Sequence, residues 1–369
     1  MTDRSHRVAL IGAGRIAVVH HGYARGVPNA RVVAVCDADR DRAEEFARPR
    51  NIPNAYDDID EMMRREEPNI VHVLTPPHTH ADLAIAAMER GANVMVEKPM
   101  ALRVSDCDRM IEAAERYGRR LCIDHNRLFD PVIRKARALV DKGVLGDIVS
   151  VEAHQGVNPV EGGAAPGDGK HWSVADPFAP LYNLGPHPLY LATEFLGDVH
   201  GVQIAGKPLG ADGLLREIRI LLEGDQTYGY VVFSMGAQPY LNHLNLFGTK
   251  ATARINLNTM TILLERVRKL PKLVGKLTAN LEPAAQLVQA TAENVIGVAL
   301  RRMKLYPGIG QNIREFYRSL DRGDPSPVDG AAGRENVRLL RIIEKHFSPG
   351  AATDAGKGNG HAREEPWTS

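Results

Sequence analysis

The chain has 369 residues, 44% of them hydrophobic and 25% charged, which is the composition of a globular protein long enough for two domains. Lys and Arg total 46 against 45 Asp and Glu, so the net charge of +1 gives no global attraction to nucleic acid, and we expect no such partner. No apolar stretch is long enough to span a membrane, residues 1–14 lack the apolar region of a signal peptide, and the three cysteines have no metal-binding spacing. We therefore expect a cytoplasmic protein with reduced cysteines.

In residues 1–124, short apolar runs alternate with helical patterns. This order predicts βαβ units, and right-handed crossovers between them give a doubly wound parallel sheet. The predicted strands are 7–11, 32–36, 70–74, 93–96 and 121–124, and the predicted helices are 15–25, 39–47, 80–90 and 105–117.

The pattern changes in residues 125–347, where several strands alternate apolar and polar residues with little helix between them. This predicts a second α/β domain with a large, mostly antiparallel open sheet. Without helical cover, its far face would expose apolar side chains, and we expect self-association there. Residues 348–369 are rich in Gly and Ala and predict a disordered tail. After a helix at 131–142, the predicted strands are 148–154, 202–205, 217–222, 227–235, 242–247 and 252–256.

The run Gly12-Ala13-Gly14-Arg15-Ile16-Ala17 has the form G-x-G-x-x-A and lies between the first strand and its helix. Glycines there permit a tight turn and close approach of a pyrophosphate, while the helix N-terminus supplies N–H donors. A tight βα turn without a ligand is the alternative. The context favours a dinucleotide site contacted by Gly12, Gly14, Arg15 and Ile16.

Asp37 ends the second predicted strand, 23 residues after Gly14. A carboxylate at this place can accept hydrogen bonds from the adenosine ribose, and it would repel a 2′-phosphate. It therefore favours NAD over NADP, although a cap for the following helix is an alternative role. Arg40 lies three residues on and could weaken that preference, so NADP stays open as the second cofactor.

Two further segments follow predicted strands and should reach the same carboxyl edge of the sheet. The stretch LTPPHTHADL at 74–83 offers Thr75, Pro76, His78 and His80 for cofactor contact or helix capping, and a metal site is not expected because no second ligand cluster has zinc-like spacing. Glu97-Lys98-Pro99 follows the apolar run at 94–96. One interpretation of this triplet is a solvated strand end. The other, more specific interpretation is that Lys98 points at a bound ligand.

Together, VALIGAGRIA, VCDADRDRA, TPPHTHADLAIAAMERGANVMVEKPMAL and NLGPHPLYLATEFLG resemble the Gfo/Idh/MocA family of NAD(P)-dependent sugar and polyol oxidoreductases. The likeness covers most of the first 200 residues. It implies a Rossmann domain, an α/β domain with an open sheet, an active site between them, and a homodimer or homotetramer. It further implies that Lys98 reaches the substrate hydroxyl and that Glu97 borders the nicotinamide.

The same resemblance makes His187 the proton acceptor, but two neighbouring positions depart from the family pattern. Asn183 stands where the family usually has Asp, and Tyr190 stands where an acid is common. An amide can hydrogen-bond a sugar hydroxyl but cannot take a proton. Trp172 could equally be a core residue. The candidate substrate contacts are Asn126, Arg127, His171, Trp172, Tyr182 and Tyr190, with Lys170 beside them.

Residues 265–306 are interpreted as a helical insertion that begins with the basic stretch RVRKLPKLVGKL. A cover for the sheet or a subunit interface is the favoured interpretation. Contact with a membrane surface or a lipid-linked substrate through 266–304 is the alternative.

The leading function is hydride transfer from a sugar, sugar-derivative or cyclic polyol hydroxyl to NAD(P). Two alternatives stay open, because a fold alone does not establish activity. One is an enzyme that keeps NAD bound for transient oxidation, as in epimerisation or elimination. The other is a non-catalytic dinucleotide-binding sensor, which the change to Asn183 would permit.

Overall fold

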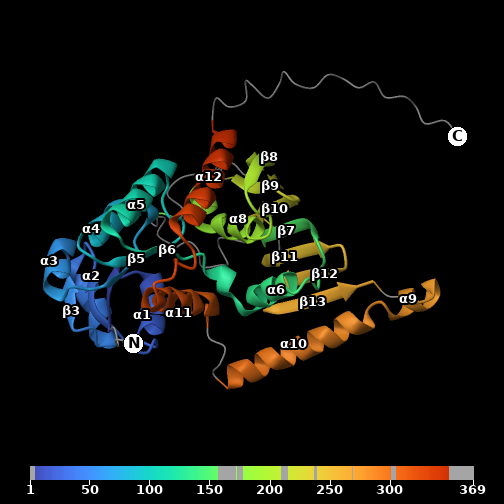
Figure 1. Cartoon of the computed structure of the whole chain (residues 1–369), viewed down its shortest axis with the longest axis horizontal. Helices are drawn as coiled ribbons and strands as arrows, with labels where there is room; N and C mark the ends of the chain where they lie inside the picture. The colour runs from blue at the N-terminus through green and yellow to red at the C-terminus, as the bar shows by residue number, and fades with distance from the viewer. Residues whose placement is uncertain are drawn as a thin grey trace.

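The protein is seen in a computed structural model as two β-sheets with helices packed on them (Figure 1). No helix among the described residues is both long and apolar enough to cross a bilayer. Lys170 and His171 and the predicted tail beyond residue 348 lie outside the described part of the chain. The structure describes residues 5–156, 172, 178–208, 215–236, 239–267, 269–300 and 305–348.

The first sheet is parallel throughout and has the strand order β3-β2-β1-β4-β5-β6. It confirms the predicted doubly wound sheet, with one strand more than predicted. That strand, β3, is only three residues long and contains no apolar run, which is why its sequence gives no strand signal. The strands are β1 His6–Ile11, β2 Ala30–Cys36, β3 Asn54–Tyr56, β4 Ile70–Val73, β5 Asn93–Val96 and β6 Leu121–Ile123.

The helices of this half cover both faces of the sheet, so its central strands are buried on both sides and read as continuous apolar runs. Sequence reasoning missed helix α3, which follows β3. The helices are α1 Arg15–Ala24, α2 Arg40–Ala47, α3 Ile59–Glu66, α4 His80–Glu89 and α5 Val104–Tyr117, with short 3₁₀ turns η1 Arg48–Arg50, η2 Pro77–Thr79 and η3 Asn126–Phe129.

The second sheet has the order β13-β12-β11-β7-β10-β9-β8 and is antiparallel except where β7 pairs with β10. Sequence reasoning missed β13, whose residues overlap the predicted insertion. Helices α6 Pro131–Asp141, α7 Ala179–Leu184 and α8 Pro186–Thr193 belong to this half. The strands are β7 Ile148–Gly156, β8 Val199–Pro208, β9 Leu215–Gly224, β10 Tyr228–Ser234, β11 Leu241–Gly248, β12 Ala251–Asn256 and β13 Thr261–Arg266.

The uncovered face of this sheet is less apolar than the sequence led us to expect. Along β7, buried Val151 and Ala153 alternate with half-buried Glu152 and His154. Asn245 of β11 lies opposite Glu152 and donates to its carboxylate at 3.2 Å. The centre of the face is therefore polar, and its large exposed side chains are mainly tyrosines of β10.

Two terminal helices return to the first half of the molecule. Helix α11, Pro307–Arg322, packs on α1, and α12, Gly330–Phe347, lies between α5 and α8 (Figure 1). Ile123 at the end of β6 donates to the carbonyl of Val328, just before α12. The segment predicted as one domain from residue 125 thus contributes packing to both halves. Between β13 and α11 run helices α9 Lys272–Thr278 and α10 Leu281–Ala299.

Candidate active site

The loop between β1 and α1 has the geometry expected of a phosphate-binding turn. Gly12 has φ +100°, and a Cβ added to it would lie 2.9 Å from the carbonyl carbon of Leu74, so only glycine fits. Gly14 precedes α1 with open space where a Cβ would be. The first turn of α1 has no side-chain cap and no acid, which leaves its N–H groups and positive dipole end for an anion. Exposed Arg15 and half-buried Ile16 begin this helix.

Asp37 lies beside this loop at the end of β2. Its Oδ2 accepts a hydrogen bond from Ala13 N at 2.8 Å, and its Oδ1 accepts one from Asp39 N at 3.1 Å. The N-cap of α2 is Asp39, whose side chain accepts from Arg42 N, so capping is not the role of Asp37. The carboxylate instead joins the glycine loop to the end of β2, where an adenosine ribose would lie.

Arg40 is already occupied by acidic neighbours. Its guanidinium pairs with Glu44 at 2.9 Å and with Asp57 at 3.4 Å, and these hydrogen bonds raise its pKa. A 2′-phosphate would have to compete with both carboxylates. The structure therefore gives Arg40 a role on the surface of α2 that does not require a cofactor.

The segment after β4 splits into exposed and buried residues. Thr75 and Pro76 are half-buried at the carboxyl edge, and His78 is exposed. His80, predicted to contact the cofactor, is 1% exposed, with Nε2 2.7 Å from Thr75 O and Nδ1 3.1 Å from Pro99 O. Burial lowers the pKa of His80 to about 4. The ring lies between the end of β4 and the turn that carries Lys98, and as a neutral imidazole with one N–H it donates to only one of these two carbonyls.

Lys98 follows β5 and reaches across to the second half of the molecule. Its Nζ donates to the main-chain oxygen of Asn183 at 2.7 Å and lies 3.5 Å from the side-chain oxygen of the same residue. Burial lowers the pKa of Lys98, the nearby charge of Arg127 lowers it further, and Glu97 opposes the shift. The ammonium is thus a poorly solvated cation that can give up its proton more readily than a surface lysine.

Beneath Lys98 lies a buried cluster formed by His20, Glu97 and Asp124. His20 Nε2 is 3.3 Å from Glu97 Oε1 and 3.4 Å from Asp124 Oδ2, while His20 Nδ1 is 3.0 Å from His72 Nδ1. Burial alone would lower the pKa of His20, but hydrogen bonds to Asp124 and Glu97 raise it to about 9. A protonated His20 therefore offsets part of the negative charge of the cluster, where burial raises the pKa of Glu97. Glu97 Oε2 also accepts from Lys98 N at 3.0 Å, which links the cluster to the lysine's main chain.

His187 begins α8 and is fixed by Tyr190, one turn later. Its Nδ1 lies 2.7 Å from the Tyr190 hydroxyl, which donates to Asn126 Oδ1 at 3.1 Å and accepts from Arg127 N at 3.2 Å. When the Tyr190 hydroxyl proton is directed at Asn126, His187 carries its own proton on Nδ1. Nε2 is then the unprotonated nitrogen. Burial and the charges of Arg127 and Lys98 lower the pKa of His187 well below its ordinary value, so it remains a neutral base.

Arg127 adds a second cation to this region. Its Nη1 donates to Gln155 of β7 at 2.7 Å and to Asn242 of β11 at 2.5 Å. Among the described residues, no carboxylate lies within ion-pair distance of its guanidinium. Asp130, whose pKa burial raises to about 6, accepts instead from Gly308 N. The side-chain amides of Gln155 and Asn242 hold the guanidinium of Arg127 in place without neutralising its charge.

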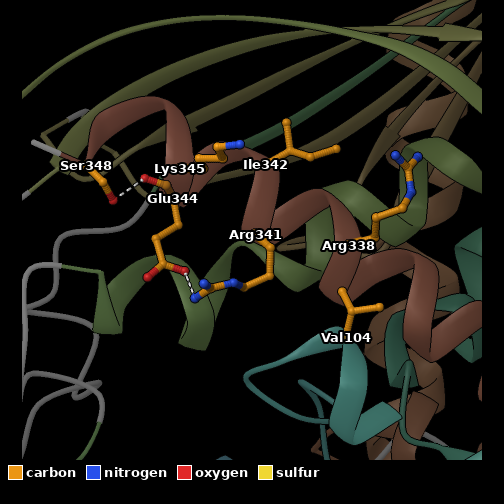
Figure 2. A pocket seen from close by; sticks show the side chains of 7 residues that line it. All are labelled: Val104, Arg338, Arg341, Ile342, Glu344, Lys345 and Ser348. Carbon is orange, nitrogen blue, oxygen red and sulfur yellow. Dashed lines mark hydrogen bonds and ion pairs between the residues drawn. The ribbon is translucent and has the colours of Figure 1, made fainter. Parts of the chain in front are cut away.

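Two of the predicted substrate contacts, Tyr182 and Trp172, are not brought together with Lys98, His187 and Arg127. The Tyr182 hydroxyl donates to Glu344 of α12, beside Arg341, and Trp172 packs half-buried against the hydrophobic core. Figure 2 shows Arg341 and Glu344 pointing toward each other in a pocket of ≈ 320 Å³ on α12. This pocket lies apart from the residues around Lys98.

The residues that sequence reasoning missed are those of the buried cluster. None of His20, His72 and Asp124 is part of a motif that the sequence analysis singled out. A signal did exist: His20 shares one helical face with Ala17 and Ala24, which are buried. A histidine on a buried face needs polar partners, but the sequence does not say which strands supply them.

The parallel sheet, the glycine turn at the β1/β4 switch point and the carboxylate of Asp37 define a dinucleotide-binding oxidoreductase fold, and the residues present fit NAD. Residues 6–125 match the model of the "Oxidoreductase family, NAD-binding Rossmann fold", and residues 133–254 match the "GFO/IDH/MocA C-terminal domain". The chain therefore belongs to the Gfo/Idh/MocA family, as the resemblance predicted.

Curated relatives share part of the chain. Myo-inositol 2-dehydrogenase of Thermotoga maritima is 33% identical over 142 residues, which cover 38% of this chain and 42% of that protein. D-glucoside 3-dehydrogenase of Escherichia coli is 34% identical over 149 residues, which cover 40% and 42%. The chain thus spans less than half the length of the curated relatives it matches.

Solved structures are similar over nearly the whole chain. The WlbA dehydrogenase from Bordetella pertussis, in complex with NADH and UDP-GlcNAcA, aligns with a TM-score of 0.74 at 20% identity and covers 94% of this chain and 96% of that one. An NAD binding oxidoreductase from Klebsiella pneumoniae aligns with a TM-score of 0.77 at 18% identity and covers 93% and 97%. At these identities the likeness shows the fold.

Proposed function

We propose that the protein is an NAD-dependent oxidoreductase that oxidises a hydroxyl of a sugar, sugar derivative or cyclic polyol. The observation that carries the proposal is the contact of Lys98 Nζ with Asn183, four residues before the neutral base His187, at the carboxyl edge of a dinucleotide-binding sheet. A hydrogen-bond donor and a proton acceptor on opposite sides of one site are the groups that alcohol oxidation requires.

In this proposal the Lys98 ammonium donates to the substrate oxygen and stabilises the negative charge that grows there. His187 Nε2 takes the hydroxyl proton, since Nδ1 already holds a proton directed at Tyr190. NAD, held by the glycine loop and Asp37, supplies the hydride acceptor. Burial strengthens the hydrogen bond from Lys98 to the substrate oxygen because little water competes with it, whereas burial lowers the proton affinity of His187.

The charge of the site favours a substrate with an acidic group. Lys98 and Arg127 are both cationic, and the two positions where the family has acids carry Asn183 and Tyr190. A guanidinium without an acidic partner can bind a carboxylate or phosphate through its free N–H groups. We therefore include a sugar acid or sugar phosphate in the proposed substrate class.

The experiment is NADH formation on a panel of polyols, neutral sugars, sugar acids and sugar nucleotides. Lys98→Met and His187→Gln should each lose about 10²- to 10⁴-fold in kcat while keeping NAD affinity within a few-fold. Exposed Lys142→Met and His346→Gln are the matched controls and should behave as the parent. Unchanged kcat in either site variant would contradict the mechanism. Tight NAD binding with no turnover of any substrate would favour the sensor instead.

Assembly, cofactor exchange and location belong to the same proposal. We infer a homodimer or homotetramer from the family, and a cytoplasmic location from three free, buried cysteines. Light scattering at micromolar concentration tests the first, and a monomer would contradict it. Mass spectrometry of the purified protein tells retained from exchanged NAD.

A further inference from the structure

Helices α9 and α10 carry an apolar surface that the described part of the chain leaves uncovered. Neither helix contains a buried residue. Fourteen of the nineteen large apolar side chains exposed by the described residues lie between residues 267 and 306. Figure 1 shows α10 running along the outer edge of the second sheet, with α9 at its end. We define the α9–α10 surface by Leu273, Leu277, Leu281, Val288, Val295 and Ile296, which are 56–76% exposed.

The orientation of α10 is the reverse of that in an ordinary surface helix. Its polar side chains face the protein: Gln286 accepts from Leu264 N at 2.8 Å and donates to Leu264 O at 3.0 Å. Asn294 donates to Thr259 O at 2.7 Å. Gln286 thus satisfies part of the free edge of β13, and Asn294 binds the turn before it, while Val288 and Val295 point away, 71% and 62% exposed. A helix in a globular protein normally buries its apolar side, so the outward side is left for a partner.

The same segment concentrates positive charge. Residues 266–304 contain eight Lys and Arg against two Glu, a net charge of +6 in a chain whose total is +1. Arg266, Lys269, Lys272 and Lys276 are exposed around α9. The remainder of the chain is therefore net acidic, and the basic residues are segregated beside the apolar ones. The partner should offer an apolar medium and negative charge together.

We propose that the α9–α10 surface docks on an anionic lipid bilayer. Its Leu, Val and Ile side chains enter the boundary between headgroups and acyl chains, and the flanking lysines bind lipid phosphates. A second copy of the chain is the weaker occupant, because pairing two such segments brings like charges together. The sequence pattern favoured an interface or a cover for the sheet, and the outward apolar side of α10 reverses that preference.

Flotation of the full chain with vesicles tests the proposal. The protein should float with phosphatidylcholine vesicles that contain phosphatidylglycerol and should stay at the bottom with pure phosphatidylcholine. Binding should weaken between about 0.1 M and about 0.5 M salt. Lys272→Ala with Lys276→Ala should bind about 30-fold more weakly, since each basic residue near the surface contributes about fivefold.

The apolar contribution is tested by Val288→Asp with Ile296→Asp, which should abolish flotation. Val149→Asp is the matched control, because Val149 is 57% exposed on β7, outside the surface, and it should float as the parent does. Thermal unfolding and NAD binding should be unchanged in all three, since the altered side chains are exposed and far from Lys98. Failure of the parent to float, or equal flotation of the double Asp variant, would overturn the proposal. A lipid-free dimer that the double Asp variant dissociates would assign the surface to a second copy and overturn it equally.

Discussion

The ammonium group of Lys98 donates a hydrogen bond to the main-chain oxygen of Asn183 at 2.7 Å and thereby joins the dinucleotide-binding half of the molecule to the second half. Both residues flank the place where a substrate hydroxyl would meet His187. A substrate oxygen that takes up the ammonium would replace this internal contact. The lysine is therefore pre-positioned by the main chain of Asn183, one of the two residues in which the chain departs from its family.

Tyr190→Phe tests the assignment of the His187 tautomer. The phenylalanine removes the acceptor for His187 Nδ1–H, so both tautomers become available and the fraction with a free Nε2 falls. We expect kcat to fall by less than the ~10² to 10⁴ that loss of the base itself would cost, with NAD affinity unchanged. The acidic limb of the kcat pH profile should also move. An unaltered pH profile and kcat would show that Tyr190 only packs against His125.

His20→Gln tests the charge balance of the buried cluster. Removal of the imidazolium leaves Glu97 and Asp124 facing each other, which should cost about 3–5 kcal/mol of folding free energy. Since the folded-state pKa of His20 is raised to about 9, its contribution is full below pH 6.5 and is lost as the pH rises through 9. Denaturant unfolding of parent and variant should converge over that range. A stability difference that stays constant between pH 6.5 and 9 would contradict a protonated His20.

Asp37→Asn tests the cofactor preference. We expect the parent to bind NAD(H) more tightly than NADP(H), because the Asp37 carboxylate repels a 2′-phosphate and Arg40 is engaged by two acids. The amide keeps an oxygen for Ala13 N, so the loop should hold while NADP(H) affinity rises relative to NAD(H). Isothermal titration measures both. Asp39→Asn removes the same charge two residues away and should leave the ratio unchanged. A parent that prefers NADP(H) would refute the assignment.

The first half of the fold could be predicted from the sequence because each sequence pattern that indicates it is local. Gly12 must be glycine for its own backbone angle, and buried parallel strands are continuous apolar runs. The edge strand β3 lacks such a run and was missed. Strand β13 contains the apolar run 262–264 but was missed because its last residues overlap the predicted helical insertion. The side of α10 that faces the sheet could not be predicted either, because the apolar positions of the helix do not show which side meets the sheet.

The functional residues that directly follow a strand could be predicted from the sequence. Those that depend on contacts between distant segments could not. Lys98 and Asp37 end strands, so their place at the carboxyl edge follows from topology. The pairing of His20 with Asp124 joins residues 104 positions apart, and no pattern in either segment indicates the other. The Tyr190 hydroxyl likewise meets Asn126 only because α8 folds back on η3.

Asn183→Asp decides whether the amide is fitted to this protein's own substrate. Asn183 Oδ1 lies 3.5 Å from Lys98 Nζ, so a carboxylate there would form a buried ion pair with the ammonium and raise the pKa of Lys98. The lysine would then be held by the protein and would donate less readily to substrate, and the lost N–H would leave a substrate acceptor unpaired at a cost of ~1 to 3 kcal/mol. We expect native kcat/KM to fall by about 5- to 150-fold, which is the loss of ~1 to 3 kcal/mol expressed as a rate ratio, while NAD affinity stays unchanged. NADH formation on the full substrate panel measures it, and exposed Asn258→Asp, which adds the same charge outside the site, is the control and should behave as the parent. Faster oxidation of simple polyols by Asn183→Asp would contradict this expectation, because it would mean that the carboxylate assists His187 and that Asn183 had merely replaced it.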